Sequence, residues 1–501
     1  NLVPKGVHNF IKRTTTPLLK TSNDNRGRRF QIKRLLNSID YSGGDYYWDI
    51  LSLGYQKEAL NDFLLPKYIN QDLFSTYKED TGIEHPKSLS DFRFIDKVTS
   101  LEGDMLVKVD RTSMQNSLEC RAPFLNKKLH ILFLCGWYPS RVLPTNGDFI
   151  QRHAEAVALK HHVTSIHIVT DPNLKINLDI KSNKINGVET HIAYLKGSKN
   201  HLKKTFLYLK AFRSLIKKSK KFDIVHLNEI FPFGIFSLYL KWFKKTPYII
   251  SEHSTIYVKN SGTKISSYQK LISKYITKKA CSICPVSNFL EKELKDSGYN
   301  GNYQTIPNVV DTNLFSPIKK ENTFLKIIHI SSLKDDHKNI KGMLNVAKLL
   351  SERIDFFEWK FIGNNGNEYK KHLKELGIKN CSISFLEHQT HLEIARHLQK
   401  ATICVSFSNY ETFGIVIPEA IACGTPVITT NTGIAIDFKE LPFCKVIPIN
   451  NEQLLLESIL NYKTLFKNID IYNMHEFIKQ QFSKKIISNK FSLLYIKSIK
   501  K

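Results

Sequence analysis

Short apolar runs alternate with amphipathic helical patterns from residue 130 onward, and this alternation limits the fold more than any other feature of the chain. We interpret the runs of the first series as strands over 131–135, 163–169, 224–227, 248–251 and 281–286. A second series consists of 327–331, 359–362, 383–386, 403–407, 426–429 and 445–449. Apolar runs of roughly four to eight residues between helices are typical of parallel strands buried on both faces. The sequence therefore predicts an α/β fold with two tandem doubly wound domains.

The carboxyl ends of such strands are where this class of fold binds ligands. Helix N-termini lie at the same edge of the sheet and offer unpaired N–H groups to anions. We place the two domains at 130–305 and 306–485, followed by a final helix in 486–501. Two facing domains of this kind predict an interdomain cleft that holds a phosphorylated ligand on one side and a second substrate on the other.

The charge balance is strongly basic. The chain of 501 residues has 73 lysine and arginine residues against 46 aspartate and glutamate residues, a net charge of +27. Such an excess attracts nucleic acid, anionic lipid or phosphorylated small molecules, although a general abundance of lysine accounts for part of it. We expect no nucleic-acid partner, because no recognition helix, RNA-binding aromatic signature or zinc-finger spacing accompanies the charge. No apolar stretch approaches the roughly 20 residues that cross a bilayer, so we expect a cytoplasmic protein.

Eight cysteines are present, most of them in apolar company. The single C-x-x-C pair is Cys281-Ser-Ile-Cys284, which has no second pair or histidine partners nearby in the sequence. We interpret these cysteines as small buried side chains and predict no metal site.

Residues 408–428 contain the strongest local signal for function. Glu411 follows a buried strand, Pro418 suits the first turn of a helix, and the carboxylate of Glu419 favours the positive end of that helix. Two carboxylates therefore bracket a glycine-containing loop at the carboxyl edge of the second sheet. Such carboxylates can accept hydrogen bonds from sugar hydroxyls, and the loop N–H groups can bind a diphosphate. At this point a simple helix cap at Glu419 explains the pattern equally well.

This segment resembles the E-x7-E motif of glycosyltransferase family 4, the group 1 family of retaining GT-B enzymes. Further segments resemble motifs of that family in the same order along the chain: Gly136-Trp-Tyr-Pro139 with Asn146-Gly-Asp-Phe149, Ile250-Ser-Glu-His253, Pro285-Val-Ser-Asn-Phe-Leu290, Ile306-Pro-Asn-Val-Val-Asp-Thr-Asn-Leu-Phe315 and His337-Lys-Asn339. The resemblance covers 130–501. It implies a GT-B fold of two Rossmann-like domains, with the acceptor domain first, the nucleotide-sugar donor domain second, and a last helix that crosses back.

The resemblance also implies how the donor is bound. Lys338, together with the amides of Phe413, Gly414 and Ile415, would stabilise the negative charge that builds up on the departing diphosphate. Glu419 would accept hydrogen bonds from the ribose hydroxyls.

Three further residues receive roles from the same resemblance. Glu411 would hold hydroxyls of the donor sugar and so orient its anomeric carbon towards the acceptor. Gly147 would let the backbone approach the reacting groups, since it has no Cβ. His253 would point from the first domain towards the donor sugar, or it is an ordinary buried histidine at the end of a strand.

The implied reaction is transfer of a hexose from a UDP- or GDP-sugar to a glycan or lipid-linked acceptor, in cell-surface polysaccharide biosynthesis. No D-x-D sequence occurs, which agrees with metal-independent transfer without a cofactor.

Two departures from the family pattern stand out. The chain reads Ile330-Ser-Ser-Leu333 where the family has an arginine in a G-R-L context. Lys334 or Lys341 could take the place of that arginine in binding phosphate. Gly433-Ile434 stands in place of a double glycine.

Residues 201–222 form a basic stretch in which Leu202, Phe206, Leu209, Phe212 and Leu215 recur at helical spacing. Such a helix can lie on an anionic membrane, here the inner face, and bring the enzyme to a lipid-linked acceptor. An ordinary helix with one face in the core and a solvated basic face is the alternative.

Residues 1–129 lack the strand–helix alternation, and 106–125 resemble the synthetase domain of glutamine-hydrolysing asparagine synthases. That chemistry needs a pyrophosphate loop of the form S-G-G-x-D-S, whereas Ser42-Gly-Gly-Asp45 lacks two of its residues. The nucleophilic N-terminal cysteine of the glutaminase domain is also missing. We therefore expect a truncated, mostly helical fragment without synthetase activity, either the remnant of a gene fusion or an assembly joint. The alternatives for the whole chain are an ATP-dependent amidotransferase and a non-catalytic basic module that binds membranes or polyanions.

Overall fold

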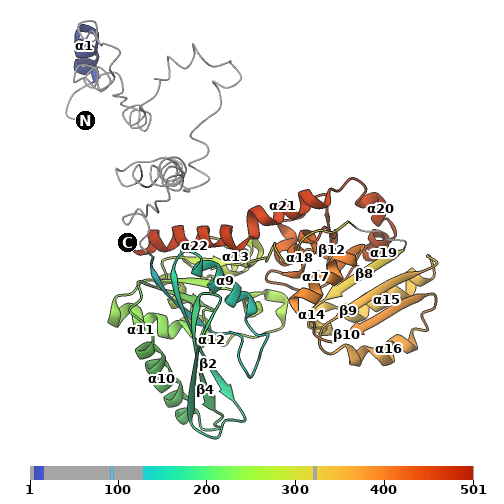
Figure 1. Ribbon diagram of the computed structural model, residues 1–501, viewed down its shortest axis with the longest axis horizontal. Helices are drawn as coiled ribbons and strands as arrows, with labels where there is room; N and C mark the ends of the chain where they lie inside the picture. Colours follow the sequence, from blue (N-terminus) through green and yellow to red (C-terminus); the bar gives the residue numbers. More distant parts are fainter. Residues whose placement is uncertain (1–4, 16–90, 92–93, 95–127, 320–323, 500–501) are drawn as a thin grey trace, which may run out of the picture. The chain divides into compact units, whose positions relative to one another are not determined.

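The computed structural model describes residues 5–15, 91, 94, 128–319 and 324–499 (Figure 1). The chain divides into two compact units, Asn1–Lys127 and Lys128–Lys501. In the first unit the structure describes the helix α1 (Lys5–Thr15). The other predictions for 1–129, including the segments 42–45 and 106–125, lie outside the described residues.

The first sheet of the second unit has seven strands in the order β3-β4-β2-β1-β5-β6-β7. Its strands are β1 (His130–Cys135), β2 (His162–Asp171), β3 (Leu178–Ile185), β4 (Val188–Lys196), β5 (Ile224–Asn228), β6 (Tyr248–Glu252) and β7 (Ile283–Pro285). All neighbours pair in parallel except β3 and β4, which form an antiparallel hairpin. This hairpin was not predicted from the sequence, because β3 is polar and largely exposed and so lacks an apolar run. Its turn, Asn186-Gly187, has positive φ at both residues, which is typical of a tight hairpin.

The second sheet is entirely parallel, in the order β10-β9-β8-β11-β12-β13. Its strands are β8 (Leu325–Ile330), β9 (Phe357–Ile362), β10 (Cys381–Leu386), β11 (Ile403–Ser406), β12 (Val427–Thr430) and β13 (Cys444–Ile447). Each coincides with one of the predicted runs, so the α/β fold with two doubly wound sheets is confirmed. The strand order reverses between β8 and β11, and a crevice at such a switch point is where open α/β sheets bind ligands.

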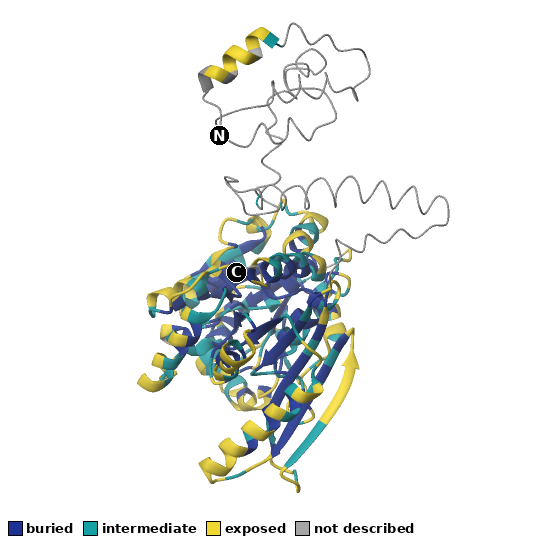
Figure 2. Cartoon of the chain, turned by 90° about the vertical axis from the view of Figure 1, so that its left-hand side faces the viewer, coloured by how far each residue is buried: buried dark blue, intermediate teal, exposed yellow. Residues whose placement is uncertain are grey.

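Helices cover both sheets, so most strand residues are buried (Figure 2). The first domain has α9 (Asp148–Ala158), α10 (His201–Lys218), α11 (Gly234–Lys244), α12 (Ser267–Lys279) and α13 (Asn288–Asp296). The second has α14 (Asp335–Lys338), α15 (Ile340–Ser351), α16 (Lys370–Glu375), α17 (His391–Lys400), α18 (Val416–Ala422), α19 (Glu452–Leu460) and α20 (Tyr462–Leu465). Within the described ranges, no helix is both long and apolar enough to cross a membrane.

The last two helices connect the domains. The helix α21 (Ile471–Phe482) packs beside α18, and α22 (Lys484–Ile499) runs back along α9 of the first domain (Figure 1). Phe491 and Tyr495 of α22 are fully buried, and the Tyr495 hydroxyl lies 2.6 Å from Nδ1 of His226 in β5. Burial of these two aromatic rings fastens the end of the chain to the first sheet.

The basic helix predicted over 201–222 is α10, but its apolar residues do not share one face. Leu207, Ala211, Phe212 and Leu215 are buried against the sheet, whereas Leu202, Phe206 and Leu209 are exposed. Helix α10 therefore has both a core-facing side and exposed apolar side chains.

Candidate active site

The second sheet brings Lys338 and Glu411 together at its switch point. Lys338 is the last residue of α14, which follows β8, and Glu411 lies in the loop after β11. The Lys338 ammonium group donates a hydrogen bond to Oε1 of Glu411, and the Ser408 hydroxyl donates to the same oxygen at 2.8 Å. Nε2 of His337 lies 3.7 Å from the other carboxylate oxygen. The predicted phosphate-binding lysine and sugar-binding glutamate are thus direct neighbours, although they are 73 residues apart.

These neighbours determine the charge of the Glu411 carboxylate. The side chain is buried, and burial alone would raise its pKa, but Lys338 and His337 together lower the pKa of Glu411 well below its usual range. The ring of Tyr410 stacks on His337 with centroids 4.2 Å apart and helps to hold it in place. Glu411 is therefore an ionised hydrogen-bond acceptor at neutral pH.

The glycine-containing loop beside Glu411 has a tightly constrained backbone. Gly414 has a φ of 81°, in the region that favours glycine. Phe413 is buried, and its carbonyl oxygen accepts a hydrogen bond from the amide of Ile434 at 2.8 Å. A Cβ on Gly433 would lie 2.5 Å from that carbonyl oxygen, so this position leaves room only for glycine.

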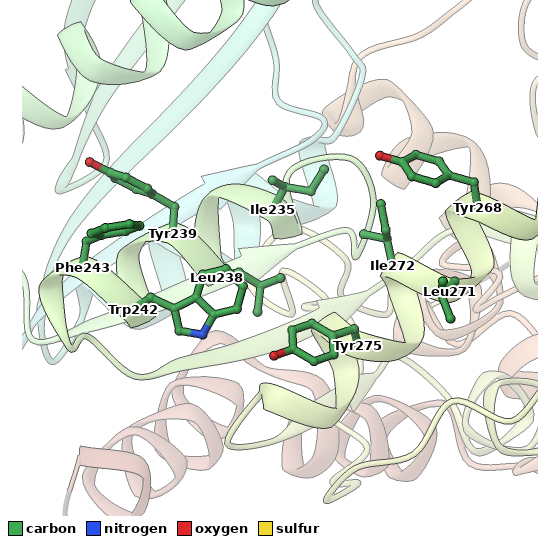
Figure 3. A pocket seen from close by; sticks show the side chains of 9 residues that line it. All are labelled: Ile235, Leu238, Tyr239, Trp242, Phe243, Tyr268, Leu271, Ile272 and Tyr275. Carbon is green, nitrogen blue, oxygen red and sulfur yellow. The ribbon is translucent and has the colours of Figure 1, made fainter.

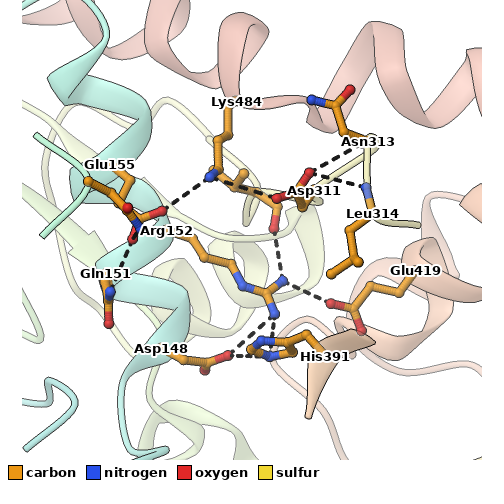
Figure 4. A network of polar contacts seen from close by, with 12 residues as sticks. Asp148, Gln151, Arg152, Glu155, Asp311, Asn313, Leu314, His391, Glu419 and Lys484 are labelled. Atoms are coloured by element: carbon orange, nitrogen blue, oxygen red, sulfur yellow. Dashed lines mark hydrogen bonds and ion pairs between the residues drawn. The ribbon is translucent and has the colours of Figure 1, made fainter. Parts of the chain in front are cut away.

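Glu419, in the first turn of α18, pairs with an arginine from the other domain (Figure 4). Nη1 of Arg152, from α9, donates to Oε1 of Glu419 at 2.8 Å. Nη2 of Arg152 lies 2.7 Å from Nε2 of His391 and 3.5 Å from a carboxylate oxygen of Asp148. Burial raises the pKa of Glu419, and the positive charge of Arg152 opposes that rise. Arg152 was not predicted as a site residue from the sequence. Its place five residues after Gly147, on the helix that follows the glycine loop, is the local signal that could have pointed to it.

A second ion-pair cluster adjoins the first one (Figure 4). Nζ of Lys484, at the start of α22, lies 3.1 Å from a carboxylate oxygen of Glu155 and 3.8 Å from one of Asp311. It therefore joins α9, the linker between the two sheets and the crossing helix at one point.

A cavity of about 790 Å³ lies between the two sheets. Its walls combine residues of both domains, among them Asp148, Arg152, Ser331, Gly363, His391 and Ile415. Of the predicted site residues, Ile415 lines the cavity directly, and Glu419 is linked to its wall through Arg152. The volume and the mixture of charged and apolar walls are typical of small-molecule sites.

Gly147 and His253 lie at the carboxyl edge of the first sheet. Gly147 has a φ of 77°, and a Cβ on it would lie 2.6 Å from the carbonyl carbon of Trp137. The ring of His253, just after β6, lies 4.7 Å from that of Phe149 and 5.5 Å from that of His153 (centroid distances). Burial lowers the pKa of His253 well below its usual value, so its ring is neutral. Within the described residues, no hydrogen bond joins the His253 ring to Lys338, Glu411 or Glu419.

Two buried carboxyl groups, Glu229 and Glu252, lie near His253, and no sequence motif assigned a role to either. Glu229 follows β5 with a φ of 81°, which is uncommon for a residue other than glycine. Burial and the neighbouring Glu252 raise the pKa of Glu229 to about 9. Glu252 is fully buried and accepts hydrogen bonds from the amides of Ile230, His253 and Ser254, and burial raises its pKa to about 7. Gly136 makes room for Glu229, because a Cβ there would clash with that carboxyl group.

Comparison with known families assigns three regions of the chain. Residues 311–447 match the model for glycosyl transferases group 1, and residues 152–314 match that for Glycosyltransferase Family 4. Residues 19–134 match the asparagine synthase model. Both resemblances inferred from the motifs are therefore confirmed.

Two relatives are similar in sequence. An uncharacterized glycosyltransferase of Methanocaldococcus jannaschii is 27% identical over 308 residues, which are 55% of this chain and 80% of that protein. A D-inositol 3-phosphate glycosyltransferase of Corynebacterium jeikeium is 41% identical over 81 residues, 15% of this chain and 19% of that protein.

Solved structures share the fold. Sucrose-phosphate synthase from Thermosynechococcus elongatus superimposes with a TM-score of 0.61 at 19% identity, over 74% of this chain and 99% of that one. The HepE protein of Anabaena, solved in complex with UDP and glucose, has a TM-score of 0.56 at 16% identity, over 73% and 98% of the two chains. The GT-B arrangement of two Rossmann-like domains is thereby confirmed.

Proposed function

The chain contains glycosyltransferase family 4 and group 1 regions, and from this premise we propose that it transfers a hexose from a nucleotide-sugar to a glycan or lipid-linked acceptor, with retention of configuration. The observation that carries the proposal is the pair of the half-buried Lys338 and the buried Glu411 at the switch point of the second sheet. A cation and an ionised carboxylate side by side suit a ligand with a diphosphate and sugar hydroxyls. The cellular role that we propose is cell-surface polysaccharide biosynthesis.

The chemistry of the leaving group explains the lysine. When the bond from the anomeric carbon to the diphosphate breaks, negative charge accumulates on the phosphate oxygens. Lys338 and the amides of Phe413, Gly414 and Ile415 stabilise that charge, and interactions that strengthen in the transition state raise the rate. Lysine replaces a metal in this scheme, in keeping with the absence of D-x-D from the sequence. Turnover is then insensitive to a chelator of divalent cations.

The carboxylates orient the donor. Glu411 accepts hydrogen bonds from hydroxyls of the sugar and so aligns its anomeric carbon. Glu419 accepts hydrogen bonds from the ribose hydroxyls and exchanges its present partner, Arg152, for them. The HepE protein of Anabaena has been solved with UDP-glucose, which makes UDP-sugars the first donors to test and GDP-sugars the second.

The acceptor lies on the side of the first domain. Gly147 keeps the backbone close to the reacting groups, and the neutral His253 faces the donor sugar. We further propose that residues 201–222 contact the inner face of an anionic membrane from the cytoplasm. The exposed apolar residues Leu202, Phe206 and Leu209 of α10, beside its lysines, support this contact.

The test is release of UDP or GDP from a panel of hexose donors by the full chain. Lys338→Met and Glu411→Gln should each lower turnover by about 10²- to 10³-fold, because each removes a group that acts on the donor in the transition state. Lys348→Met is the matched control, since it removes an exposed Lys–Glu pair of α15. Normal turnover in both site variants, with the donor used by the original chain, refutes the assignment of the site.

The match of residues 19–134 to the asparagine synthase model supports a second candidate, an ATP-dependent amidotransferase. That activity releases pyrophosphate from ATP in the presence of aspartate. We expect none, because Ser42-Gly-Gly-Asp45 falls short of a pyrophosphate loop. Aspartate-dependent release of pyrophosphate by the full chain would show that this expectation is wrong.

A further inference from the structure

Helix α11 is apolar on both of its faces. Its inner face packs against the first sheet through Gly234, Ser237, Leu238 and Leu240, which are buried. Its outer face carries Ile235, Tyr239, Trp242 and Phe243, all exposed, at the spacing of one helical stripe. A surface helix of a globular protein normally turns charged or polar residues to the solvent. We therefore expect the outer stripe of α11 to contact a partner rather than solvent.

A matching stripe on α12 lies opposite (Figure 3). Tyr268, Leu271, Ile272 and Tyr275 recur at the same helical spacing, while the other side of α12 buries Ser273, Ile276 and Thr277. Between the two stripes is a groove of about 610 Å³, lined by nine apolar or aromatic residues: Ile235, Leu238, Tyr239, Trp242, Phe243, Tyr268, Leu271, Ile272 and Tyr275. Phe243, Leu271 and Tyr268 are 73%, 71% and 68% exposed. A continuous apolar surface of this kind marks an interaction site.

The charge around the groove has a single sign. From Ile230 to Ala280 the chain has nine lysines and one acidic residue, the buried Glu252. The lysines are Lys241, Lys244, Lys245, Lys259, Lys264, Lys270, Lys274, Lys278 and Lys279. Among the described residues, no lysine of α11 or α12 forms an ion pair with a carboxylate. The partner of this surface is therefore negatively charged at its rim and apolar at its centre.

Charge also argues against a second copy of this chain as the occupant. A two-fold contact would place the same lysine-rich rims of α11 and α12 against each other, and like charges at an interface are unfavourable. A lipid leaflet satisfies both requirements, because tryptophan and tyrosine favour the level of the headgroups and lysines extend to anionic ones.

We propose that the groove between α11 and α12, which we call the α11–α12 groove, binds the surface of an anionic lipid bilayer. Its aromatic and leucine side chains enter the boundary between headgroups and acyl chains, and the surrounding lysines pair with anionic headgroups. The surface is distinct from the exposed residues of α10, although the two helices adjoin: Phe212 of α10 stacks on Phe236 of α11 with ring centroids 4.1 Å apart. Lipid binding here does not require sugar transfer, so the inference can hold or fail independently of the proposed function.

The experiment is flotation of the full chain with vesicles of phosphatidylcholine alone or mixed with phosphatidylglycerol. We expect binding only to the anionic vesicles, weakened by added salt. Trp242→Glu combined with Leu271→Glu should reduce the bound fraction at least about tenfold, because both side chains lose their apolar contact and gain charge of the same sign as the lipid. Tyr472→Glu is the matched control, since Tyr472 is 65% exposed on α21 of the second domain.

Three results would overturn the proposal. Equal binding of the Trp242→Glu/Leu271→Glu variant and the original chain places the contact elsewhere. Loss of binding with Phe206→Glu, together with full binding by the groove variant, assigns the contact to α10. A dimer in sedimentation velocity that dissociates in the groove variant, without vesicle binding by the original chain, identifies a second copy as the occupant. Because every substituted side chain is more than half exposed or lies at the groove surface, unchanged thermal melting curves verify that the variants are folded.

Discussion

Removal of Arg152 tests the connection between the two domains. Its side chain is 12% exposed and that of Glu419 4% exposed, so Arg152→Met leaves a carboxylate buried without its cation. Loss of one partner from a buried ion pair typically costs about 3–5 kcal/mol. We expect about 3 kcal/mol here, the lower end of that range. The reason is that Asp148 and Arg152 line a cavity of about 790 Å³, and water there can partly solvate the charges that remain when Arg152 is removed.

The pair can be separated from its surroundings by a double-mutant cycle. Arg152→Met combined with Glu419→Gln removes both charges and should cost about 2 kcal/mol less than the sum of the two single changes. The assay is urea unfolding followed by tryptophan fluorescence, in which the fully buried Trp359 reports on the second domain. A cost of Arg152→Met below about 0.5 kcal/mol, typical of ordinary surface substitutions, would refute the reasoning.

The pH dependence of the same variant has a definite sign. Burial raises the native pKa of Glu419 above its unfolded value, so its contribution to stability is greatest at low pH and is lost as the pH rises. Without Arg152 the native pKa rises further. The destabilisation caused by Arg152→Met should therefore be smaller at about pH 5 than at about pH 8. An equal or larger cost at the lower pH would contradict this explanation.

Three more changes test the rest of the structure. Gly147→Ala should destabilise the chain by at least about 1–2 kcal/mol in urea unfolding, because alanine is strained at this φ and its Cβ meets Trp137. Phe491→Ala should lower the free energy of unfolding by about 3–5 kcal/mol and release α22 from the first domain. Hydrogen exchange of α22 measures that release. Amide protection equal to that of the original chain would contradict the packing. With a native pKa of about 9, the Glu229 carboxyl group stabilises the folded chain only while it stays protonated, so the original chain should lose stability as the pH rises towards 9. Glu229→Gln should remove this loss. Identical profiles of stability against pH for the two chains would disprove the explanation.

Local sequence patterns were sufficient for most of the fold. A strand buried on both faces favours apolar residues, and the inner strands of the second sheet, such as β11 and β12, accordingly left recognisable runs. The edge strand β10 is only half-buried but still has alternating apolar residues that left a run. The hairpin of β3 and β4 left none in its outer strand, because an edge strand in contact with water has no need of apolar residues.

By itself, the sequence determined which residue types surround the site, through short motifs such as the loop around Glu411 and the glycine at 147. Only the tertiary structure decided the partners. Lys338 meets Glu411 across 73 residues, and Arg152 meets Glu419 across 267, and no local period records such separations. The same holds for α11: its composition shows an apolar helix, but packing decides which stripe faces the sheet and which is left outside. Periodicity is a property of neighbours along the chain, whereas an ion pair or an uncovered face depends on how distant segments fold against each other.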